Sequence, residues 1–294
     1  MSSYIELWKT WTEIEPYPMP NTANKMLSGY SVAGLRTNFF VQPDLMLDAG
    51  ISAPFSPKSI LITHGHGDHI ANLPFHLIIK RNPDNTYTQI NIYCPKQIVQ
   101  LIQNYIRAMF QLSDCNDQMQ PEGYKVIGVE PGDEFELAIG KTKHTVQVFS
   151  CVHSVPCVGY GVSLCKNKIK PEYAGLKSNE IKELKAKQIE ITQEIKSKEF
   201  CFLGDTTHQV FIDNPDILSW SNVMVECTFV SPDDLSHATE KSHMHWNNLK
   251  QVIVANPQVN WILTHFSQKY KKSELEEFFA KENLPNVKLW MNIK

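Results

Sequence analysis

The sequence predicts a layered α/β fold, because short apolar runs and helical patterns alternate along its 294 residues. Hydrophobic residues make up 42% of the chain, which is enough to build one domain of packed layers over residues 1–294. Several apolar runs end in His or Asp, and the ends of strands are where sheets usually present ligands to a crevice. We therefore expect one layered domain with a site at the ends of its strands.

The individual elements follow from the spacing of the apolar residues. Short runs rich in β-branched or aromatic residues predict strands at Phe39–Val41, Leu45–Leu47, Ile60–Ile62, Ile90–Tyr93, Val146–Phe149, Phe200–Leu203, Val223–Val225 and Trp261–Leu263. Amphipathic spacing predicts helices at Ile70–Lys80, Lys96–Leu112, Asn179–Lys187, Trp246–Ala255 and Ser273–Lys281. There is no obvious repeat, low-complexity tract or linker between them, which agrees with a single domain.

The densest chemical signal follows the run Ile60–Ile62, where three histidines and one aspartate occur within six residues. His64 and His66 can face the same ion, because side chains in an extended backbone alternate with period two. Asp68 and His69 fall where the next helical pattern begins, so they can face a second ion. Nitrogen and oxygen ligands of this kind suit zinc, with manganese or iron as alternatives. A histidine-rich surface loop is the competing interpretation, which the preceding apolar run disfavours.

A metal cluster of this size should draw further ligands from distant segments. Three polar residues, each at or just after the end of a strand-like run, are the candidates: His153, Asp205 and His265. Considered singly, each could equally be a loop histidine or a carboxylate that caps a turn. Considered together with the motif at residues 64–69, they predict one site with two divalent metal ions.

Together these segments resemble the metallo-β-lactamase superfamily and, within it, the ribonuclease Z branch, also called the tRNA 3′-processing endonucleases. The matching segments, in family order, are Thr63–His69, His153–Pro156 with Gly159 and Tyr160, Leu203–Thr206, Glu226–Phe229, His243 and Leu263–Ser267. The resemblance implies an αββα sandwich of two facing mixed sheets with flanking helices and with the metal ions at one edge.

The resemblance also implies a role for each matched residue. One ion would be held by His64, His66 and His153, the other by Asp68, His69 and His265, and Asp205 would bridge the two. Two such ions make a water molecule acidic and bind the attacked phosphoryl group, and Asp68 would also orient that water. Glu226 and His243 would form the unit that delivers a proton to the leaving oxygen.

Glu226 stands out on physical grounds as well. It follows the buried run Val223–Val225, where a carboxylate is costly unless it is paired or functional. His243 is the partner that fits the family pattern best. His237 and His245 are alternative proton donors, or all three histidines lie on the surface beside the helix that begins at Trp246.

Three departures from the family pattern concern the proton donor and the substrate. Val225 replaces the histidine of the common His-Glu-Ala-Thr motif, and Met244 and His245 follow His243 where Ser-Thr is usual. The Gly/Pro-rich arm that contacts tRNA in the family has no clear counterpart. A lysine-rich inserted segment at 166–198, with nine lysines and five glutamates, occupies that part of the chain.

The lysine-rich segment has two interpretations. Its excess of positive charge could attract phosphates, because neutralising them releases counterions. Alternatively, Ser178 caps a short helix whose Ile181 and Leu184 face inward while the charged side chains stay solvated. In either case the segment could protrude near the site.

The favoured function is a metal-dependent endoribonuclease of ribonuclease Z type that acts on RNA, with tRNA 3′ ends as one candidate substrate. The alternatives are a small-molecule hydrolase of lactams, thioesters or lactones, an enzyme with both activities, or a binding protein that has lost catalysis. Asp205 stands where zinc β-lactamases of the cysteine-ligand type have Cys. The short segment after His265 leaves little room for the thioester-binding domain of a glyoxalase II.

Composition and charge favour a cytoplasmic enzyme. No apolar stretch reaches membrane-spanning length, and the first residues lack the pattern of a signal peptide. Seven cysteines, an odd number, argue against a disulfide scaffold, and Cys151 and Cys227 are expected to be small buried side chains beside the sheet. The family resemblance also implies a homodimer as one possible assembly.

Overall fold

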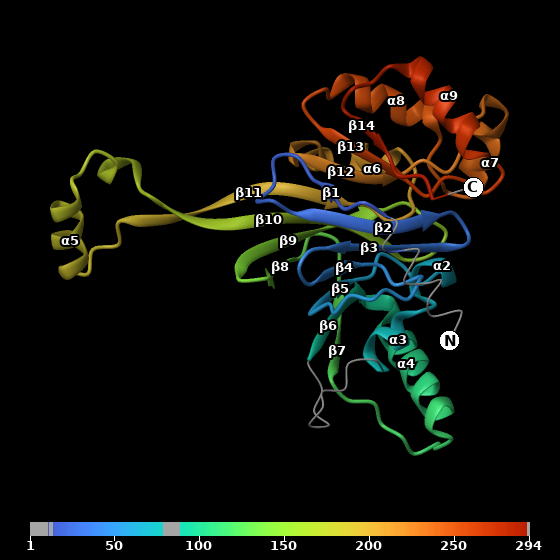
Figure 1. Ribbon diagram of the computed structural model, residues 1–294, viewed down its shortest axis with the longest axis horizontal. Helices are drawn as coiled ribbons and strands as arrows, with labels where there is room; N and C mark the ends of the chain where they lie inside the picture. The colour runs from blue at the N-terminus through green and yellow to red at the C-terminus, as the bar shows by residue number, and fades with distance from the viewer. Residues whose placement is uncertain (1–10, 12–13, 79–88, 293–294) are drawn as a thin grey trace.

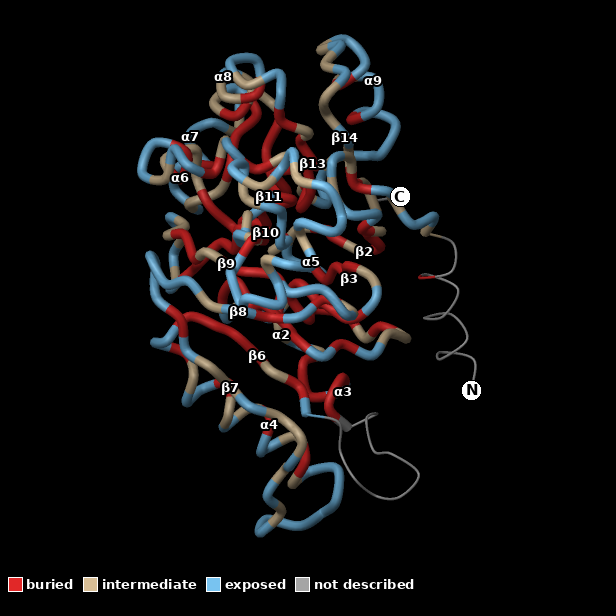
Figure 2. Tube along the Cα trace, turned by 90° about the vertical axis from the view of Figure 1, so that its left-hand side faces the viewer, coloured by how far each residue is buried: buried red, intermediate tan, exposed pale blue. Residues whose placement is uncertain are grey.

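The computed structural model describes residue 11, residues 14–78 and residues 89–292, and in them the chain forms the four layers of an αββα sandwich (Figure 1). Two sheets of seven strands each can be traced in this part of the chain. Helices cover the outer face of each sheet, and the two inner faces pack against one another (Figures 1 and 2). The predicted layered fold is therefore confirmed.

The first sheet follows the order of the chain. Its strands are β1 (Tyr17–Pro18), β2 (Met26–Val32), β3 (Arg36–Val41), β4 (Leu45–Leu47), β5 (Ser59–Leu61), β6 (Ile90–Pro95) and β7 (Tyr124–Val129). Strands β1 to β4 pair antiparallel, whereas β4 to β7 pair parallel. The carboxyl ends of β4 and β5 therefore lie side by side at one edge.

The second sheet repeats this arrangement with a longer antiparallel half. Its strands are β8 (Glu134–Ile139), β9 (Thr142–Cys151), β10 (Cys157–Ile169), β11 (Thr192–Phe202), β12 (Asn222–Glu226), β13 (Asn260–Thr264) and β14 (Val287–Leu289). Strands β8 to β11 pair antiparallel, and β11 to β14 pair parallel. The carboxyl ends of β11, β12 and β13 thus form a second row of strand ends.

The helices divide between the two outer faces. In the described residues, α2 (Gly67–Ile70), α3 (Leu73–Ile78) and α4 (Val99–Asp114) lie on the side of the first sheet. On the side of the second sheet lie α6 (Gln209–Asp213), α7 (Leu235–Glu240), α8 (Trp246–Ala255) and α9 (Lys272–Glu282). Short 3-10 turns occur at η1 (Lys96–Ile98), η2 (Pro171–Tyr173), η3 (Pro215–Ser219) and η4 (Pro232–Asp234).

Three apolar clusters hold the layers together. The central cluster fills the space between the sheets, where the rings of Phe39 and Phe202 meet edge to face at 6.0 Å. A second cluster, which includes Trp220 and Trp246, joins the second sheet to its helices. A third, which includes Ile60, joins the first sheet to α3 and α4. Figure 2 shows the buried chain running through the middle of the sandwich.

The predicted strands are all present, although some are longer or shifted by one residue. The sequence missed β1, β2, β7, β8, β10 and β14, several of which are very short or carry exposed charged residues and so lack a continuous apolar run. The helix expected at Ile70–Lys80 is two helices, and its end falls outside the described residues. Pro74 is the second residue of α3, where its missing N–H costs no helical hydrogen bond, so a new helix begins there.

A long arm leaves the body of the protein between β10 and β11 (Figure 1). The two strands continue as an antiparallel hairpin to the pair Ile169 and Thr192, and α5 (Ser178–Ala186) lies at the tip. Eleven residues of β11 at roughly 3.3 Å each separate this tip from the carboxyl end of the strand. The segment therefore protrudes as expected, but its tip does not lie near the site, because the arm points away from the strand ends.

The arm helix also differs from the prediction in its cap. Lys177 is the N-cap residue and Ser178 is the first helical residue, so Ser178 does not cap the helix. The Glu180 carboxylate accepts the Lys177 backbone N–H at 2.7 Å instead. Ile181 and Leu184 are half-buried, as expected of the inward face, while the lysines beside them are exposed.

The described helices include none that combines the length and the apolar character needed to cross a bilayer. All seven cysteines are free thiols, in agreement with the expectation from their odd number. Cys227 is buried beside the sheet as predicted, whereas Cys151 is half-buried.

Candidate metal centre

The candidate site lies where the parallel strands of both sheets end. Asp48 directly follows β4, and His64 follows β5 by three residues. In the second sheet, Asp205 follows β11, Glu226 is the last residue of β12 and His265 directly follows β13. Because these strand ends meet at one edge of the sandwich, the fold brings together side chains from distant parts of the chain.

The backbone is unusual at three residues of this edge. Asp48, Ser242 and His265 have φ angles of 55°, 55° and 60°, in the left-handed region that residues with a Cβ rarely adopt. Each such residue costs about 1–3 kcal/mol, and such residues are frequent at functional sites. The surrounding structure therefore holds a strained backbone at Asp48 and His265, whose side chains belong to the site, and at Ser242, whose carbonyl oxygen accepts from His153.

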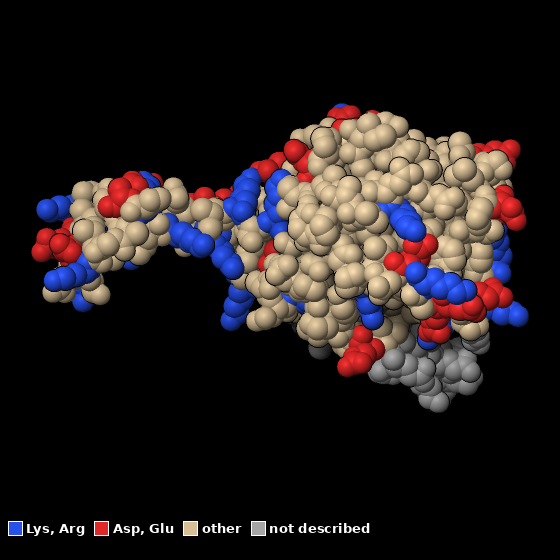
Figure 3. Space-filling view, turned by 90° about the horizontal axis from the view of Figure 1, so that it is seen from above, with Lys and Arg blue, Asp and Glu red and all other residues tan. Residues whose placement is uncertain are grey.

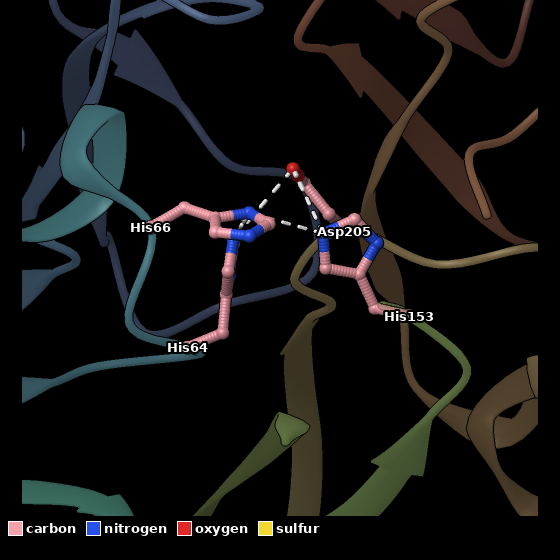
Figure 4. Close-up of side chains that lie close together, drawn as sticks. All are labelled: His64, His66, His153 and Asp205. Atoms are coloured by element: carbon pink, nitrogen blue, oxygen red, sulfur yellow. Dashed lines mark hydrogen bonds and ion pairs between the residues drawn. The ribbon is translucent and has the colours of Figure 1, made fainter. Parts of the chain in front are cut away.

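The first group of ligand-type side chains consists of His64, His66, His153 and Asp205 (Figure 4). One ligand atom from each of the four lies within 4.8 Å of the others. His66 Nδ1 is 3.2 Å from His64 Nε2 and 3.2 Å from His153 Nε2. Three imidazole nitrogens therefore converge from a strand end and two loops.

The second group consists of Asp68, His69 and His265. His265 Nε2 is 3.4 Å from His69 Nε2 and 3.3 Å from Asp68 Oδ2. Asp205 Oδ2 connects the two groups, because it is 3.5 Å from both His69 Nε2 and His265 Nε2 and 3.7 Å from His64 Nε2. One carboxylate oxygen thus faces both groups of side chains.

Asp48 and Thr63 orient the ligands of the first sheet. The Thr63 hydroxyl lies 3.0 Å from the Asp48 carboxylate and must donate to it, so it accepts the proton of His64 Nδ1 at 3.0 Å. His69 Nδ1 donates to Asp48 Oδ2 at 2.7 Å. Both rings therefore direct Nε2 to the centre, the orientation that carboxylates and hydroxyls impose on metal-binding histidines.

The ligands of the second sheet are oriented in the same way. His153 Nδ1 donates to the carbonyl oxygen of Ser242 at 3.0 Å. The Thr228 hydroxyl donates to Glu226 Oε2, so it accepts from His265 Nδ1 at 3.1 Å. Again the Nε2 atoms of both histidines face the centre.

This arrangement fits metal ions. Histidine nitrogens approach one another at 3.2 to 3.4 Å, so a proton or a metal ion must lie between the two members of each pair. The donor set of histidine nitrogens and carboxylate oxygens is the one that zinc and similar divalent ions prefer. Metal dependence therefore follows from the chemistry of the donors.

The pKa values point to the same need for positive charge. Burial and the neighbouring His69 hold the pKa of His64 well below its usual range, so its ring is neutral. Burial alone would lower the pKa of His69, but Asp205 and Asp48 hold it well above its usual range. Burial alone would raise the pKa of Asp205, yet His265 and His69 hold it well below. The carboxylates at the centre thus require a proton or a metal ion beside them.

Glu226 and His243 form a hydrogen-bonded pair at the edge of the centre. Glu226 Oε1 lies 2.8 Å from His243 Nδ1 and accepts the backbone N–H of Thr206 at 2.8 Å. Glu226 is buried, whereas the His243 side chain is 18% exposed. Burial alone would lower the pKa of His243, but Glu226 raises it to about 9. A partly exposed imidazole is therefore held beside a buried carboxylate.

The two alternative histidines are used elsewhere. His245 caps α8, because its Nδ1 accepts the backbone N–H of Asn247 at 3.1 Å, and its Nε2 donates to Ser231 O at 2.8 Å. His237 is exposed on α7 and packs edge to face against Phe229. Neither histidine contacts Glu226, so His243 is the histidine that pairs with it.

The sequence missed Asp48, Thr63 and Thr228, whose side chains hold the histidines in place. Asp48 carried a usable signal, since it follows the apolar run Leu45–Leu47 just as polar residues follow the other site strands. The two threonines carried none, because threonine is common in and beside strands. Gly34 was also missed, although its backbone N–H binds Asp68 Oδ2 at 2.9 Å.

Comparison with known proteins places this geometry in context. A family model described as Beta-lactamase superfamily domain matches residues 40–266. The chain is similar to tRNase Z TRZ1 of Arabidopsis thaliana, with 29% identity over 276 residues that cover 90% of each sequence. It is also 30% identical to the chloroplastic tRNase Z TRZ2 of the same plant, over 87% of this chain and 71% of that relative.

Solved structures show the same fold. The metallo-β-lactamase fold protein YhfI of Bacillus subtilis aligns with a TM-score of 0.59 at 15% identity, over 90% of this chain and 95% of that one. Human tRNase Z, short form, aligns with a TM-score of 0.50 at 16% identity, over 95% and 93% of the two chains. At these identities the structural matches support the sandwich fold alone.

Proposed function

The chain belongs to the β-lactamase superfamily and, within it, to the ribonuclease Z branch, and on this basis we propose that it is an endoribonuclease that processes tRNA 3′ ends. It is a metal-dependent hydrolase of that family. One observation carries the proposal. The two groups of metal-ligand side chains, which share Asp205, lie at the same strand ends as the hydrogen-bonded pair of Glu226 and His243.

Two divalent ions, which we propose to be zinc, with manganese or iron as alternatives, fit the two groups of ligands. His64, His66 and His153 hold one ion. Asp68, His69 and His265 would hold the other, and Asp205, whose carboxylate lies near both groups, would be shared by the two. When bound, such ions lower the pKa of a water molecule and neutralise the charge of an attacked phosphate.

The protein's own groups then position the water and deliver the proton. The Gly34 N–H donates to Oδ2 of Asp68 and fixes this carboxylate, which is suited to orient the attacking water. Glu226 accepts the Nδ1 proton of His243 and so orients the ring. His243 donates the proton of its other nitrogen, Nε2, to the leaving oxygen of the RNA.

The arm suits a large, charged substrate. Its lysines outnumber its glutamates nine to five over residues 166–198, and α5 holds Lys182 and Lys185 exposed at the tip. Figure 3 shows lysines along the arm and where it joins the body. Because the arm projects far from the strand ends, it can contact only a substrate of RNA dimensions while the centre acts on the scissile bond. A small substrate bound at the strand ends would not extend as far as the arm.

We also propose that the chain forms a homodimer, as the family resemblance suggested. On α4, Leu101 and Leu112 are exposed on the same helical face as Ala108 and the half-buried Tyr105. Sedimentation at several protein concentrations tests this assembly, and a single species at the monomer mass throughout would refute it.

The decisive experiment is cleavage of a 3′-extended tRNA precursor by the zinc-loaded protein, with the cut site mapped. Asp205→Ala should lower the rate by at least about 10³-fold, because it removes the carboxylate shared by both metal sites. Asp213→Ala is the matched control, since Asp213 is an exposed aspartate on α6. It should cleave like the unmodified protein.

Each outcome has a distinct meaning. A single metal-dependent cut at the base of the acceptor stem supports tRNA 3′ processing. Scattered cutting would replace that proposal with a general ribonuclease. An Asp205→Ala variant that keeps its fold and its full rate would refute the assigned centre.

A further inference from the structure

Two cysteines face each other across the loop that carries His153. Cys151 ends β9, Cys157 begins β10, and the two are direct partners in the antiparallel ladder. Opposed residues in such a ladder have Cα atoms about 4.5–5.5 Å apart and side chains on the same face. A disulfide spans about 4.4–6.8 Å between Cα atoms, so the backbone already has a suitable separation.

Both cysteines are free thiols, and as opposed residues of the ladder they project their side chains from the same face. Gly159, two residues further along the same face of β10, leaves room for them: a Cβ there would lie 3.3 Å from Cys151 Sγ. No side chain at position 159 therefore occupies the space beside the Cys151 sulfur.

A small reagent can reach the pair from one side. A cleft of about 360 Å³ is lined by Cys151, His153 and Cys157, among others. Cys151 is half-buried, whereas Cys157 is 7% exposed. The thiol of Cys157 also donates to the carbonyl oxygen of Asp205 at 3.4 Å. The pair thus lies between solvent and the strand end that carries the central carboxylate.

We propose that Cys151 and Cys157 are a redox-active pair that a peroxide oxidises to a disulfide. In the first step the Cys151 sulfur breaks the O–O bond of hydrogen peroxide and forms a sulfenic acid, and one water molecule leaves. The Cys157 sulfur then displaces the hydroxyl group, which leaves as a second water molecule with the Cys157 proton. Two thiols are oxidised, one peroxide is reduced, and the disulfide closes the loop at residues 152–156.

The disulfide would change the surroundings of the metal centre. Oxidation removes the S–H proton, so the Asp205 carbonyl loses its donor from Cys157. The same bond ties together the two ends of the loop that holds His153. Because Asp205 and His153 are ligands only under the proposed function, this consequence rests on that proposal. The oxidised protein should release zinc to a competing chelator several-fold faster than the reduced protein.

Peptide mapping tests the disulfide directly. The zinc-loaded full chain is treated with one equivalent of hydrogen peroxide, its remaining thiols are alkylated, and it is cut by chymotrypsin after Phe149 and Tyr160. The peptide 150–160 contains Cys151 and Cys157 as its two cysteines. It should appear unalkylated and lighter by two hydrogen atoms, and dithiothreitol should restore both thiols.

Two results would overturn the proposal. One is a peptide 150–160 that remains doubly alkylated while the exposed Cys115 is oxidised. The other is a disulfide between Cys151 and Cys201, the buried thiol on the adjacent part of β11. Cys151→Ser should abolish the closed peptide, and Cys115→Ser is the matched control that should retain it. Cys157→Ser provides a second variant for the buried partner.

The zinc readout separates this proposal from the proposed function. Peroxide should accelerate zinc release in the unmodified protein and leave Cys151→Ser unchanged. Equal release from the reduced and oxidised forms would refute the link between the pair and the metal centre. If no RNA is cleaved but the disulfide forms reversibly, the function fails while the redox pair stands.

Discussion

The two ends of β11 differ in almost every physical respect. At its carboxyl end, Phe200 and Phe202 are buried in the core and the chain leads to Asp205. At its amino end the strand leaves the body, and lysines gather where the arm joins it (Figure 3). Lys196, for example, forms an exposed pair with Glu134 of β8. Exposed ion pairs of this kind contribute about 0–1 kcal/mol each. β11 therefore connects the buried metal centre, where each side chain has a defined partner, to the exposed arm, where one charged side chain can replace another.

This difference teaches where single substitutions matter. At the metal centre, the Nδ1 atoms of His64, His69, His153 and His265 each have a defined partner, such as Asp48 for His69. Removal of one partner leaves a buried polar group unpaired, which is expensive. On the arm, one lysine can replace another as a source of positive charge. Function at the centre should therefore depend on individual side chains and their hydrogen bonds. Function at the arm should depend on its total charge.

The largest effect is expected at the proton donor. His243→Ala should slow cleavage of the RNA precursor by about 10²–10⁴-fold, because the leaving ribose oxygen needs a proton. A small phosphodiester with a nitrophenolate leaving group should be slowed much less, since that oxygen leaves without one. His237→Ala, on the exposed face of α7, is the matched control and should retain both rates. Equal slowing of both substrates by His243→Ala would instead indicate a positional role.

The next effect concerns the carboxylate behind His69. Asp48→Asn should weaken zinc binding by about 10–100-fold, because His69 loses the carboxylate that orients it. Asp44→Asn is the matched control at the other end of β4, where Asp44 pairs with Lys58 and accepts the Gly140 N–H. Competition with a chelator measures both affinities. If Asp48→Asn and Asp44→Asn bind zinc with equal affinity, the carboxylate of Asp48 does not support zinc binding through His69.

Removal of the arm tests whether it acts on substrate binding alone. Residues 166–195 can be replaced by Asn-Gly, because Cys165 and Lys196 are paired across the hairpin. We expect kcat/KM for the tRNA precursor to fall by about 10-fold or more at low salt, through KM, because phosphate contacts are lost. Hydrolysis of a small phosphodiester should stay within about twofold. A parallel loss of both activities would mean that the arm supports the centre itself.

The smallest effect is expected for single charges on the arm helix. Lys182→Gln with Lys185→Gln should raise KM for RNA a few-fold at low salt and leave it unchanged at high salt. The free energy of unfolding should change by less than about 0.5 kcal/mol, since both side chains are exposed. Glu183→Gln is the matched control, and it should lower KM if total charge decides. Equal effects at low and high salt would point to specific contacts instead.

The sequence predicted the layers and the clustered ligands because both depend on local patterns. A polar residue at the end of a buried strand can be recognised by the apolar run before it, and Asp205 and His265 each follow such a run. Asp48 follows one too and was overlooked, because its partners Thr63 and His69 lie 15 and 21 residues away. The contacts of Asp48 with these residues form only in the folded chain, so no local sequence pattern predicts them.

The paired strands of the arm escaped prediction for a different reason, although its helix and its protrusion were expected. Its strands pair with each other over ten residue pairs from Tyr160 to Ile169, yet their outer parts are exposed on both faces. Without a buried face there is no hydrophobic alternation to recognise. Asn72 lies between α2 and α3, and its side chain donates to Gly50 O at 2.8 Å. That contact also arises only in the folded chain.

The distance along the chain between the two halves of the centre has a consequence for synthesis. His69 and His265 meet in the centre although 196 residues separate them. At about 5–20 residues per second, the ribosome needs roughly 10–40 s to make that interval. A nascent chain therefore carries the first histidines long before it can complete the centre. Translation itself delays nuclease activity, so an unfinished chain cannot cut RNA beside the ribosome that is making it.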